Sequence, residues 1–383
     1  MELYIHLPFC KSKCRYCDFA SYAGCEKHMS AYIEALLLEA AEEASKLPSS
    51  AIETVFIGGG TPSLLPFELL KRLLSGIRDI FRIEHDAEFT TEANPGTLTM
   101  PWLHTAVKHG VNRLSMGMQA FQTELLKTLG RIHDFTQVQQ SVTMAQEAGI
   151  NNISLDLMFG LPGQTLGHWR ETLHAALSLR PQHLSCYGLI PEDGTPLKAD
   201  LDAGRLTLPD EETERAMYDE TIALLAANGY GQYEISNFAK SGFACKHNLG
   251  YWRQIPYLGL GASASSMLPC DALNAAYIRQ TNPSALDEYR QMVEQASWSE
   301  RETIVISHDD ARFETMMLGL RTTDGVCERV FQQMHGKSLD ECYGKKLKGM
   351  ESRGLMLHAD SHWRLTRRGM DVQNAILVEL MDE

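Results

Sequence analysis

The stretch HLPFCKSKCRYCDF, residues 6–19, holds three cysteines, Cys10, Cys14 and Cys17, in the spacing C-x₃-C-x₂-C. No fourth cysteine lies directly beside them. A cubane [4Fe–4S] cluster has four irons and normally takes four thiolates. Three thiolates leave one iron open to a further ligand, so this loop predicts a cluster at which chemistry can take place.

A structural zinc site is the alternative for these cysteines. Structural zinc takes four protein ligands in closed tetrahedral geometry. Only Cys25 and His28 lie close enough in sequence to complete such a site, and neither stands at a usual paired spacing. A disulfide framework is disfavoured because the nine cysteines are an odd number.

The composition is that of a globular protein in a reducing compartment. The chain has 383 residues, of which 44% are hydrophobic and 22% charged, so two or three domains are expected. Cysteines without a basic-then-apolar leader predict a cytoplasmic protein, with peripheral attachment to a membrane left open. A net charge of −14 opposes non-specific attraction to nucleic acid or anionic lipid.

Short β-type runs alternate with helical stretches through the first 230 or so residues. Strands are expected at 3–7, 54–57, 88–91, 113–118, 152–159 and 183–189. Helices are expected at 29–46, 67–81, 101–109, 135–148, 169–179 and 211–228. Such alternation predicts a parallel sheet with right-handed crossovers, which we assign to one domain over residues 1–230.

The residues that follow these strands favour a partial (β/α)6 barrel over an open doubly wound sheet. The cysteine loop, the GGGTP run at 58–62, Glu92, Gln119 and Asp156 all lie at or near the carboxyl ends of successive strands. In (β/α) barrels the active site is built at that end. The predicted fold class is therefore α/β, beginning with this barrel.

The pattern changes after about residue 230, where we expect a small linking region over residues 231–305. Residues 232–239 look like one further strand, and a Gly- and aromatic-rich stretch follows at 243–266. The rest of the chain, residues 306–383, is expected to be mainly helical.

This last part resembles a winged-helix module, with a hairpin at 355–358 and 362–365 before a final helix at 367–380. Winged helices often bind DNA, and the module has local positive charge. Its basic residues are Lys345, Lys346, Lys348, Arg364, Arg367 and Arg368. Because the whole chain is acidic, we expect a protein-packing module and no specific nucleic acid partner.

Several residues at the expected barrel rim have chemical and structural interpretations. The glycines at 58–60 let a ligand approach the backbone, although a plain strand–helix turn explains them equally well. Glu92 and Asp156 can accept hydrogen bonds from ribose hydroxyls or an ammonium group, or cap the next helix or turn. Arg131 can hold a carboxylate through its guanidinium fork, or form a surface salt bridge.

The run HNLGYW at 247–252 is the most unusual stretch of the second half. Histidine is a common axial haem ligand, and aromatic side chains can pack on a porphyrin face. The alternative is a histidine satisfied within an aromatic-rich loop. No C-x-x-C-H is present, so c-type attachment of haem is not indicated.

Together these motifs resemble the radical S-adenosylmethionine (SAM) superfamily. The cysteine run is joined by GGGTPS (58–63), EANPGT (92–97), GVNRLSMGMQAF (110–121), LGRIH (129–133), LDLMFGLPGQ (155–164) and YEISNFA (233–239). These further runs resemble the coproporphyrinogen III dehydrogenase-like subfamily. HNLGYW is similar to the HNxxYW motif of its HemW branch, the haem chaperones.

The resemblance implies roles for individual residues. Cys10, Cys14 and Cys17 would hold a [4Fe–4S] cluster, whose open iron chelates the amino and carboxylate groups of SAM. The positions that match the SAM site are Tyr4, Tyr16, Gly59, Gly60, Thr61, Glu92, Gln119, Arg131 and Asp156. The HNxxYW motif implies a haem site that involves His247, with Tyr251 and Trp252 beside it.

The sequence departs from the dehydrogenase in two ways. The dehydrogenase has the motif C-x₃-C-x₂-C-x-C, and Phe19 stands at the position of its fourth cysteine. The extension that precedes the cysteines in that enzyme is also expected to be missing. Both differences oppose oxidative decarboxylation of coproporphyrinogen III and, together with HNLGYW, favour haem binding and delivery. The alternative is an enzyme that carries out this decarboxylation or a radical opening of the haem ring. The expected partners are haem, a haem-accepting respiratory protein and an electron donor such as flavodoxin or ferredoxin.

Overall fold

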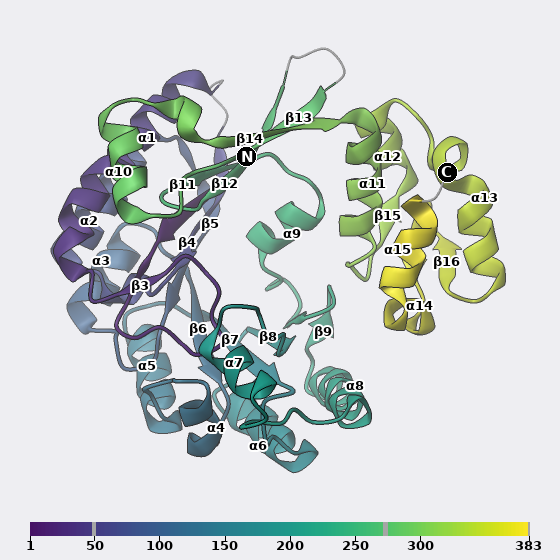
Figure 1. Cartoon of the computed structure of the whole chain (residues 1–383), viewed down its shortest axis with the longest axis horizontal. Coiled ribbons are helices and arrows are strands. Elements are labelled where there is room, and N and C mark those ends of the chain that lie inside the picture. The colour runs from purple at the N-terminus through teal and green to yellow at the C-terminus, as the bar shows by residue number, and fades with distance from the viewer. Residues whose placement is uncertain (48–50, 271–274, 382–383) are drawn as a thin grey trace.

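A curved sheet forms the core of the protein. The structure is a computed structural model that describes residues 1–47, 51–270 and 275–381. Within these residues the sheet has 12 strands in the order β14-β13-β12-β11-β1-β4-β5-β6-β7-β8-β10-β9. Helices cover its outer, convex side, and the last part of the chain forms a separate layer beside it (Figure 1).

Six neighbouring parallel strands make up the expected partial barrel. They are β1 (Glu2–Leu7), β4 (Ile52–Gly59), β5 (Ile83–Ala93), β6 (Arg113–Gln119), β7 (Asn152–Phe159) and β8 (His183–Gly188). The helices between and after them are α1 (Met29–Lys46), α2 (Phe67–Ile80), α3 (Met100–Lys108), α5 (Phe135–Glu147), α6 (Leu166–Ser178) and α8 (Glu211–Ala227). The predicted α/β fold class is confirmed. Two short helices, α4 (Thr123–Thr128) and α7 (Pro196–Asp202), were not expected.

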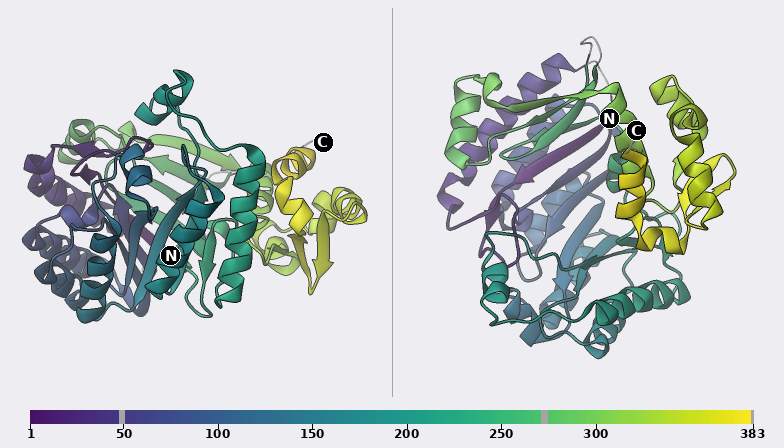
Figure 2. Two further views of the ribbon diagram at one scale, coloured as in Figure 1. Left: turned by 90° about the horizontal axis from the view of Figure 1, so that it is seen from below. Right: turned by 45° about the vertical axis from the view of Figure 1, so that its right-hand side comes forward.

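The residue pattern explains these elements. In α2, Leu70, Leu73, Leu74 and Ile77 are buried, and this spacing places them on one face of the helix against the sheet. Every residue of β6 is buried, as expected for a parallel strand that is covered on both faces. The right-hand view of Figure 2 shows the strands as one curved layer with helices behind it.

The linking region adds strands to both edges of the barrel sheet. β11 (Tyr257–Leu260) pairs in parallel with β1, and the antiparallel strands β12 (Ser265–Pro269), β13 (Ala275–Thr281) and β14 (Glu302–Ser307) continue from it. At the other edge, β10 (Asn237–Ala239) pairs antiparallel with β8 and with β9 (Gly231–Gln232).

The single strand expected at 232–239 is therefore wrong. The chain turns between β9 and β10, where the Tyr233 N–H donates to the carbonyl of Asn237 at 3.1 Å. The Ser236 N–H donates to the carboxylate of Glu234 at 2.8 Å, which closes the turn. The aromatic stretch that follows also differs from a loop, because it contains the helix α9 (Lys246–Trp252).

A buried charged network ties the linking region to α1. Arg301 follows a short 3₁₀ helix, η3 (Trp298–Glu300), after α10 (Leu286–Glu294). Its guanidinium pairs with Glu39 at 2.8 Å and Glu43 at 2.6 Å, and both carboxylates belong to α1. Nε of Arg301 donates to Asn282 at 2.8 Å, so this guanidinium joins two positions of the linking region to the distant helix α1.

The C-terminal module has the element order of a winged helix: helix, strand, two helices and a hairpin. Its elements are α11 (His308–Gly319), β15 (Val326–Cys327), α12 (Glu328–His335), α13 (Leu339–Ser352), β16 (Met356–Ala359) and β17 (His362–Leu365). The last helix expected at 367–380 is instead two, α14 (Arg367–Asp371) and α15 (Gln373–Met381), because Val372 leaves the helical conformation with φ −121°.

Three of the module's basic residues make contacts within the chain. Lys346 donates to the carbonyl of Leu380, and Lys348 pairs with Asp340 at 2.7 Å. Arg367 pairs with Asp219 of α8 at 2.5 Å, which contributes to holding the module against the barrel. In the part of the chain that the structure describes, no helix combines the length and the apolar character that crossing a bilayer requires.

Candidate functional site

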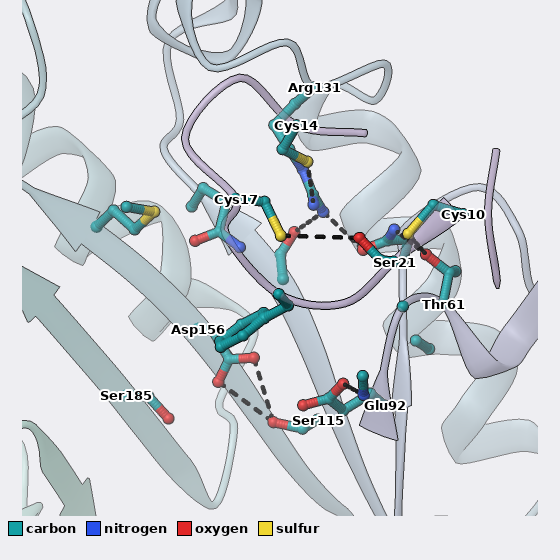
Figure 3. A pocket seen from close by; sticks show the side chains of 18 of the residues that line it. Cys10, Cys14, Cys17, Ser21, Thr61, Glu92, Ser115, Arg131, Asp156 and Ser185 are labelled. Atoms are coloured by element: carbon teal, nitrogen blue, oxygen red, sulfur yellow. Dashed lines mark hydrogen bonds between the residues drawn. The ribbon is translucent and has the colours of Figure 1, made fainter. Parts of the chain in front are cut away.

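A cavity of about 450 Å³ opens at the carboxyl ends of the barrel strands. This volume is within the range of cofactor and small-molecule sites. Cys10, Cys14 and Cys17 line it together (Figure 3). Residues of β4, β5, β6, β7 and β8 complete the wall, so the residues of the predicted barrel rim line one cavity.

The cysteine loop is held at both ends by backbone hydrogen bonds. β2 (Phe9–Cys10) pairs in parallel with β3 (Tyr22–Ala23), and the Tyr22 N–H donates to the carbonyl of Pro8 at 2.7 Å. Beneath the loop, one ring nitrogen of His6 hydrogen-bonds the hydroxyl of Tyr4 at 2.9 Å. Its other ring nitrogen hydrogen-bonds the carbonyl of Ala20 at 2.8 Å. His6 therefore anchors the loop to the end of β1.

Each of the three sulfurs has a polar neighbour. The hydroxyl of Thr61 donates to Cys10 Sγ at 3.7 Å, and Nη1 of Arg131 donates to Cys14 Sγ at 3.4 Å. Ser21 Oγ lies 4.0 Å from Cys17 Sγ. Burial raises the pKa of the Cys10 and Cys17 thiols, so a thiolate there needs such donors or a metal to offset the lost solvation. Three cysteines with donors aimed at two of their sulfurs fit a cluster, whose properties depend on hydrogen bonds to sulfur.

The zinc alternative finds no support in this arrangement. Cys25 and His28 are not among the residues that line the cavity; they lie at the start and end of η1 (Glu26–His28). A closed tetrahedral set is therefore not present around the cysteine loop.

The glycine run passes tightly beneath the cysteine loop. Gly59 has φ +106°, and a Cβ there would lie 2.5 Å from the ring of His6. A Cβ at Gly60 would lie 2.6 Å from the carbonyl oxygen of Phe9. The N–H of Gly59 donates to Glu92 at 3.1 Å, so the run also orients a carboxylate of the next strand. Glycine is required here by close packing as well as by any approaching ligand.

Two buried carboxyl groups face the cavity. Burial, reinforced by the negative charge of Asp156, raises the pKa of Glu92 to about 7. Burial also raises the pKa of Asp156, which accepts hydrogen bonds from Ser115 at 3.2 and 3.3 Å. Figure 3 shows these carboxyl groups at the end of the cavity away from the cysteines. They can accept hydrogen bonds from hydroxyl or ammonium groups of a ligand that lies between them and the cysteines.

The backbone at the end of β6 is distorted. Gln119 has φ 63°, and the pairing of β6 with β7 shifts register between Gly117 and Gln119. A positive φ in a residue other than glycine is uncommon and is found where a side chain is re-aimed. Here the distortion brings the Gln119 side chain to the cavity wall.

Most of the predicted site residues come together. Besides the three cysteines, the cavity is lined by Tyr16, Gly59, Gly60, Thr61, Glu92, Gln119, Arg131 and Asp156. Tyr4 is not among the lining residues; its ring stacks on Phe56 at 6.3 Å, and its hydroxyl supports His6. His247 also does not line the cavity.

The helix α9, which carries the HNLGYW run, packs near the amino ends of the first barrel strands. A Cβ at Gly250 would lie 1.8 Å from the carboxylate of Glu2, the first residue of β1. Glu88 of β5 accepts the backbone N–H groups of Lys246 and His247, and so caps the start of the helix. Asn248 lines the cavity, so α9 forms the floor of the site opposite the cysteine loop.

His247 itself is enclosed between α9 and the sheet. Its side chain is 1% exposed, and its ring stacks on Phe56 at 5.2 Å. Nδ1 hydrogen-bonds the hydroxyl of Thr54 at 2.7 Å, and Nε2 hydrogen-bonds the hydroxyl of Tyr251 at 3.0 Å. Burial lowers the pKa of His247 to about 3. Ligation of haem iron needs one of these nitrogens, so the geometry of this structure does not favour the predicted role.

Sequence reasoning missed several residues of the wall and floor. They are Phe56, Asn94, Arg113, Ser115, Met158, Ser185, Tyr187 and Asn248. Arg113 could have been identified from the sequence. An arginine at the start of a strand that is expected to be buried must find a partner for its charge. Asn248 was within a quoted motif, but only the position of α9 shows that it faces the cavity.

Comparisons with known proteins match the whole chain. The model of the radical SAM superfamily matches residues 4–176, and that of the HemN C-terminal domain matches residues 306–372. The protein named heme chaperone HemW of Bacillus subtilis is 39% identical over 381 residues, which cover 99% of each chain. The protein of the same name in Escherichia coli is 34% identical, over 98% of this chain and 97% of its own.

A solved structure shows the same fold. Coproporphyrinogen III oxidase (HemN) from Escherichia coli superposes with a TM-score of 0.83 over 99% of this chain and 89% of its own. The sequences are 24% identical, so this likeness concerns the fold alone. It includes the C-terminal module as well as the barrel.

Proposed function

The chain belongs to the radical SAM superfamily and, within it, to the family of its HemW relatives. From this membership we propose that it is a haem chaperone that binds a [4Fe–4S] cluster, SAM and haem and passes the haem to an acceptor protein. The observation that carries the proposal is the shared cavity: three cysteines face eight of the nine residues that match the SAM site. The relatives named heme chaperone align over almost the entire chain.

Different residues of the cavity would bind the cluster and the separate groups of SAM. Cys10, Cys14 and Cys17 supply three thiolates, and Arg131 lies where its guanidinium can hold both a sulfur and a ligand carboxylate. Glu92 and Asp156 are placed to accept hydrogen bonds from the amino group or the ribose hydroxyls of SAM. When bound, the cluster supplies one-electron reduction of the SAM sulfonium.

The cavity also bears on the distinction from the dehydrogenase. Phe19 lines it and is 65% exposed, so an apolar ring stands where that enzyme has a fourth cysteine. The side chain has no proton or thiol to offer a substrate. This favours binding and delivery of haem over decarboxylation of coproporphyrinogen III.

One anaerobic sample can test the proposal. We expect the reconstituted protein to bind about one haem per chain, to transfer it to an acceptor haem protein, and to leave coproporphyrinogen III unchanged with reductant and SAM present. More than one molecule of protoporphyrinogen IX per chain would establish the enzyme instead. Absence of haem binding above that of an unrelated protein would remove the chaperone.

The ligand of the haem iron needs its own test, because His247 is hydrogen-bonded at both nitrogens. Tyr251→Phe removes only the partner of Nε2, whereas His247→Ala removes the imidazole. If His247 is the ligand, Tyr251→Phe keeps the Soret band and His247→Ala changes it. Cys245→Ala is the control for thiolate ligation. An unchanged Soret band and affinity in His247→Ala would place the ligand on another residue.

The proposal includes partners that depend on this activity. The acceptor would be a respiratory haem protein, and the electron donor a small redox protein such as flavodoxin or ferredoxin. The protein itself would work in the cytoplasm, either free or attached peripherally to the membrane. Pull-down of the haem-loaded protein against such acceptors, with the haem-free protein as control, tests the first of these expectations.

A further inference from the structure

A buried guanidinium lies at the floor of the cavity. Arg113 is the first residue of β6, is 1% exposed, and lines the cavity. Its Nε is enclosed and has no hydrogen-bond partner within the described ranges of the chain. A buried charge is costly unless it is paired and hydrogen-bonded, so this group calls for an explanation.

The nearby carboxylates do not fully account for the buried charge of Arg113. Arg113 lies within the electrostatic influence of Glu88 and Asp156. However, Glu88 already accepts the thiol of Cys245 at 3.3 Å and the two N–H groups that begin α9. Asp156 already accepts the hydroxyl of Ser115. Both carboxylates are therefore oriented by other donors, and the buried Nε of Arg113 has no acceptor among the described residues.

Asn248, on helix α9, lines the same cavity as Arg113 of β6. His247 and Tyr251 bond each other while His247 faces Thr54, and Gly250 packs on Glu2, so these parts of α9 are committed to the sheet. Asn248 is only half-buried and lines the cavity. The floor thus presents a guanidinium and a carboxamide, both of which can donate hydrogen bonds.

We propose that Arg113 and Asn248 form a carboxylate-binding subsite, which receives a propionate group of the haem. The inference rests on the proposed function, because it assigns a position to one group of the same ligand. The planar fork of arginine matches a carboxylate in two parallel hydrogen bonds.

Charge compatibility supports the same assignment. Glu92 has a pKa of about 7, and the pKa of Asp156 is also raised by burial, so the cavity is less negative than its two carboxyl groups suggest. An incoming carboxylate therefore meets a fixed positive charge at the floor. The competing explanation is that Arg113 only balances the charges of Glu88 and Asp156 and touches no ligand.

Esterified haem separates these explanations. We expect the reconstituted protein to bind haem about tenfold or more tightly than haem dimethyl ester, since the ester loses charge-assisted hydrogen bonds but keeps the iron and the ring. The measurement is a Soret titration with each compound. Equal affinities in the wild type would overturn the subsite while leaving the haem-chaperone proposal intact. Failure to bind either compound would overturn both.

Substitutions locate the effect at the floor. Asn248→Asp adds a negative charge and should reduce the preference for haem over its ester to less than about threefold, with ester affinity unchanged. Asn228→Asp, at the exposed end of α8, is the matched control and should keep the wild-type preference. Arg113→Gln should remove the preference, while Arg113→Lys keeps the charge and should recover part of it.

A measurement of SAM binding distinguishes an Arg113 that only positions Asp156 from an Arg113 that contacts the haem propionate. If Arg113 only supports Asp156, Arg113→Gln weakens the effect of SAM on the spectrum of the reduced cluster and leaves the preference for haem over its ester unchanged. That result would overturn the subsite. Loss of the preference with an unchanged SAM response supports it, and Asn248→Asp remains decisive if Arg113→Gln fails to fold.

Discussion

Arg131 donates a hydrogen bond to the sulfur of Cys14, with an Nη1–Sγ distance of 3.4 Å. Its other terminal nitrogen donates to Asn94 at 2.7 Å and to the carbonyl of Gly117 at 2.8 Å. The guanidinium is therefore fixed by β6 and by the loop after β5, and is not free to follow the cysteine loop. A fixed positive charge beside a thiolate favours the more negative, reduced state of a cluster.

Replacement of Arg131 by Met should lower the reduction potential of the reconstituted cluster. A shift of about 60 mV is expected if a hydrogen bond of about 1.4 kcal/mol differs between the two redox states. The potential is measured by a redox titration followed by electron paramagnetic resonance, without SAM. Arg15→Met is the control, because Arg15 lies within the cysteine loop itself but pairs with Asp200 instead of a sulfur. Equal shifts in both variants would contradict the special role of Arg131.

Substitution of a cluster ligand should abolish the cluster. We expect about four irons and four sulfides per chain in the reconstituted wild type. Cys10→Ala, Cys14→Ala or Cys17→Ala should each lose them, whereas Cys186→Ala, a buried thiol of β8, should retain them. Iron and sulfide analysis on anaerobic samples checks this. One tetrahedral zinc per chain in anaerobically purified protein is the opposite result.

Loss of either cavity carboxylate should weaken the response to SAM. Glu92→Ala and Asp156→Ala should each reduce affinity by about 1–3 kcal/mol, as expected for the loss of a buried ligand hydrogen bond. The measurement is the change in the spectrum of the reduced cluster during a SAM titration. Glu84→Ala, a partly exposed position on the same strand as Glu92, should leave it unchanged. Unaltered affinity in both cavity variants would remove these residues from the SAM site.

The Arg301 network should be a major contributor to stability. Arg301→Met leaves Glu39 and Glu43 of α1 without their common partner, and should lower the free energy of unfolding by about 3–5 kcal/mol. Arg72→Met is the control, because the exposed pair of Arg72 with Glu34 also joins α1 and is worth about 1 kcal/mol or less. Denaturant unfolding of the three proteins gives the comparison. Similar losses in both variants would be inconsistent with a buried network.

Glu2 should make stability depend on pH. Burial raises its pKa from 4.5 to about 8, so the folded protein binds a proton that the unfolded chain has lost between these values. Its contribution to stability is therefore full below about pH 4.5 and is lost as the pH rises to about 8.

Glu2→Gln removes this dependence. Its unfolding midpoint should exceed that of the wild type more at pH 8 than at pH 5, by the equivalent of a few kcal/mol or less. Glu53→Gln, an exposed position on the neighbouring strand, is the control. A constant difference across this pH range would show that Glu2 is ionised throughout.

Most helices and strands of the barrel could be predicted from the sequence, because each depends on a residue pattern within its own segment. The expected helix at 29–46 and strand at 152–159 coincide with α1 and β7, where apolar periodicity continues from end to end. The rim residues could be grouped because parallel strands bring their carboxyl ends to one side. The course of the chain at 232–239 could not be read in this way, because its turn is closed by the side chain of Glu234.

Helix α9, the floor of the site, could not be placed from the sequence for a different reason. The position of α9 depends on Glu2, Thr54 and Glu88, which are distant from it in sequence and belong to three strands. No periodicity within HNLGYW reports these contacts. The motif could therefore be recognised, but which of its residues faces the cavity could not.

The pairing of β1 with β11 also sets an order for biosynthesis. Glu2 pairs with Tyr257 in the sheet, so this edge of β1 stays unpaired until β11, about 250 residues later in the chain, has been synthesised. The cysteine loop is synthesised soon after β1, whereas α9 is synthesised only shortly before β11. A cluster inserted during translation would enter a site without a floor. The complete cavity exists only after β11 has joined the sheet, so maturation of the protein is coupled to completion of its sheet.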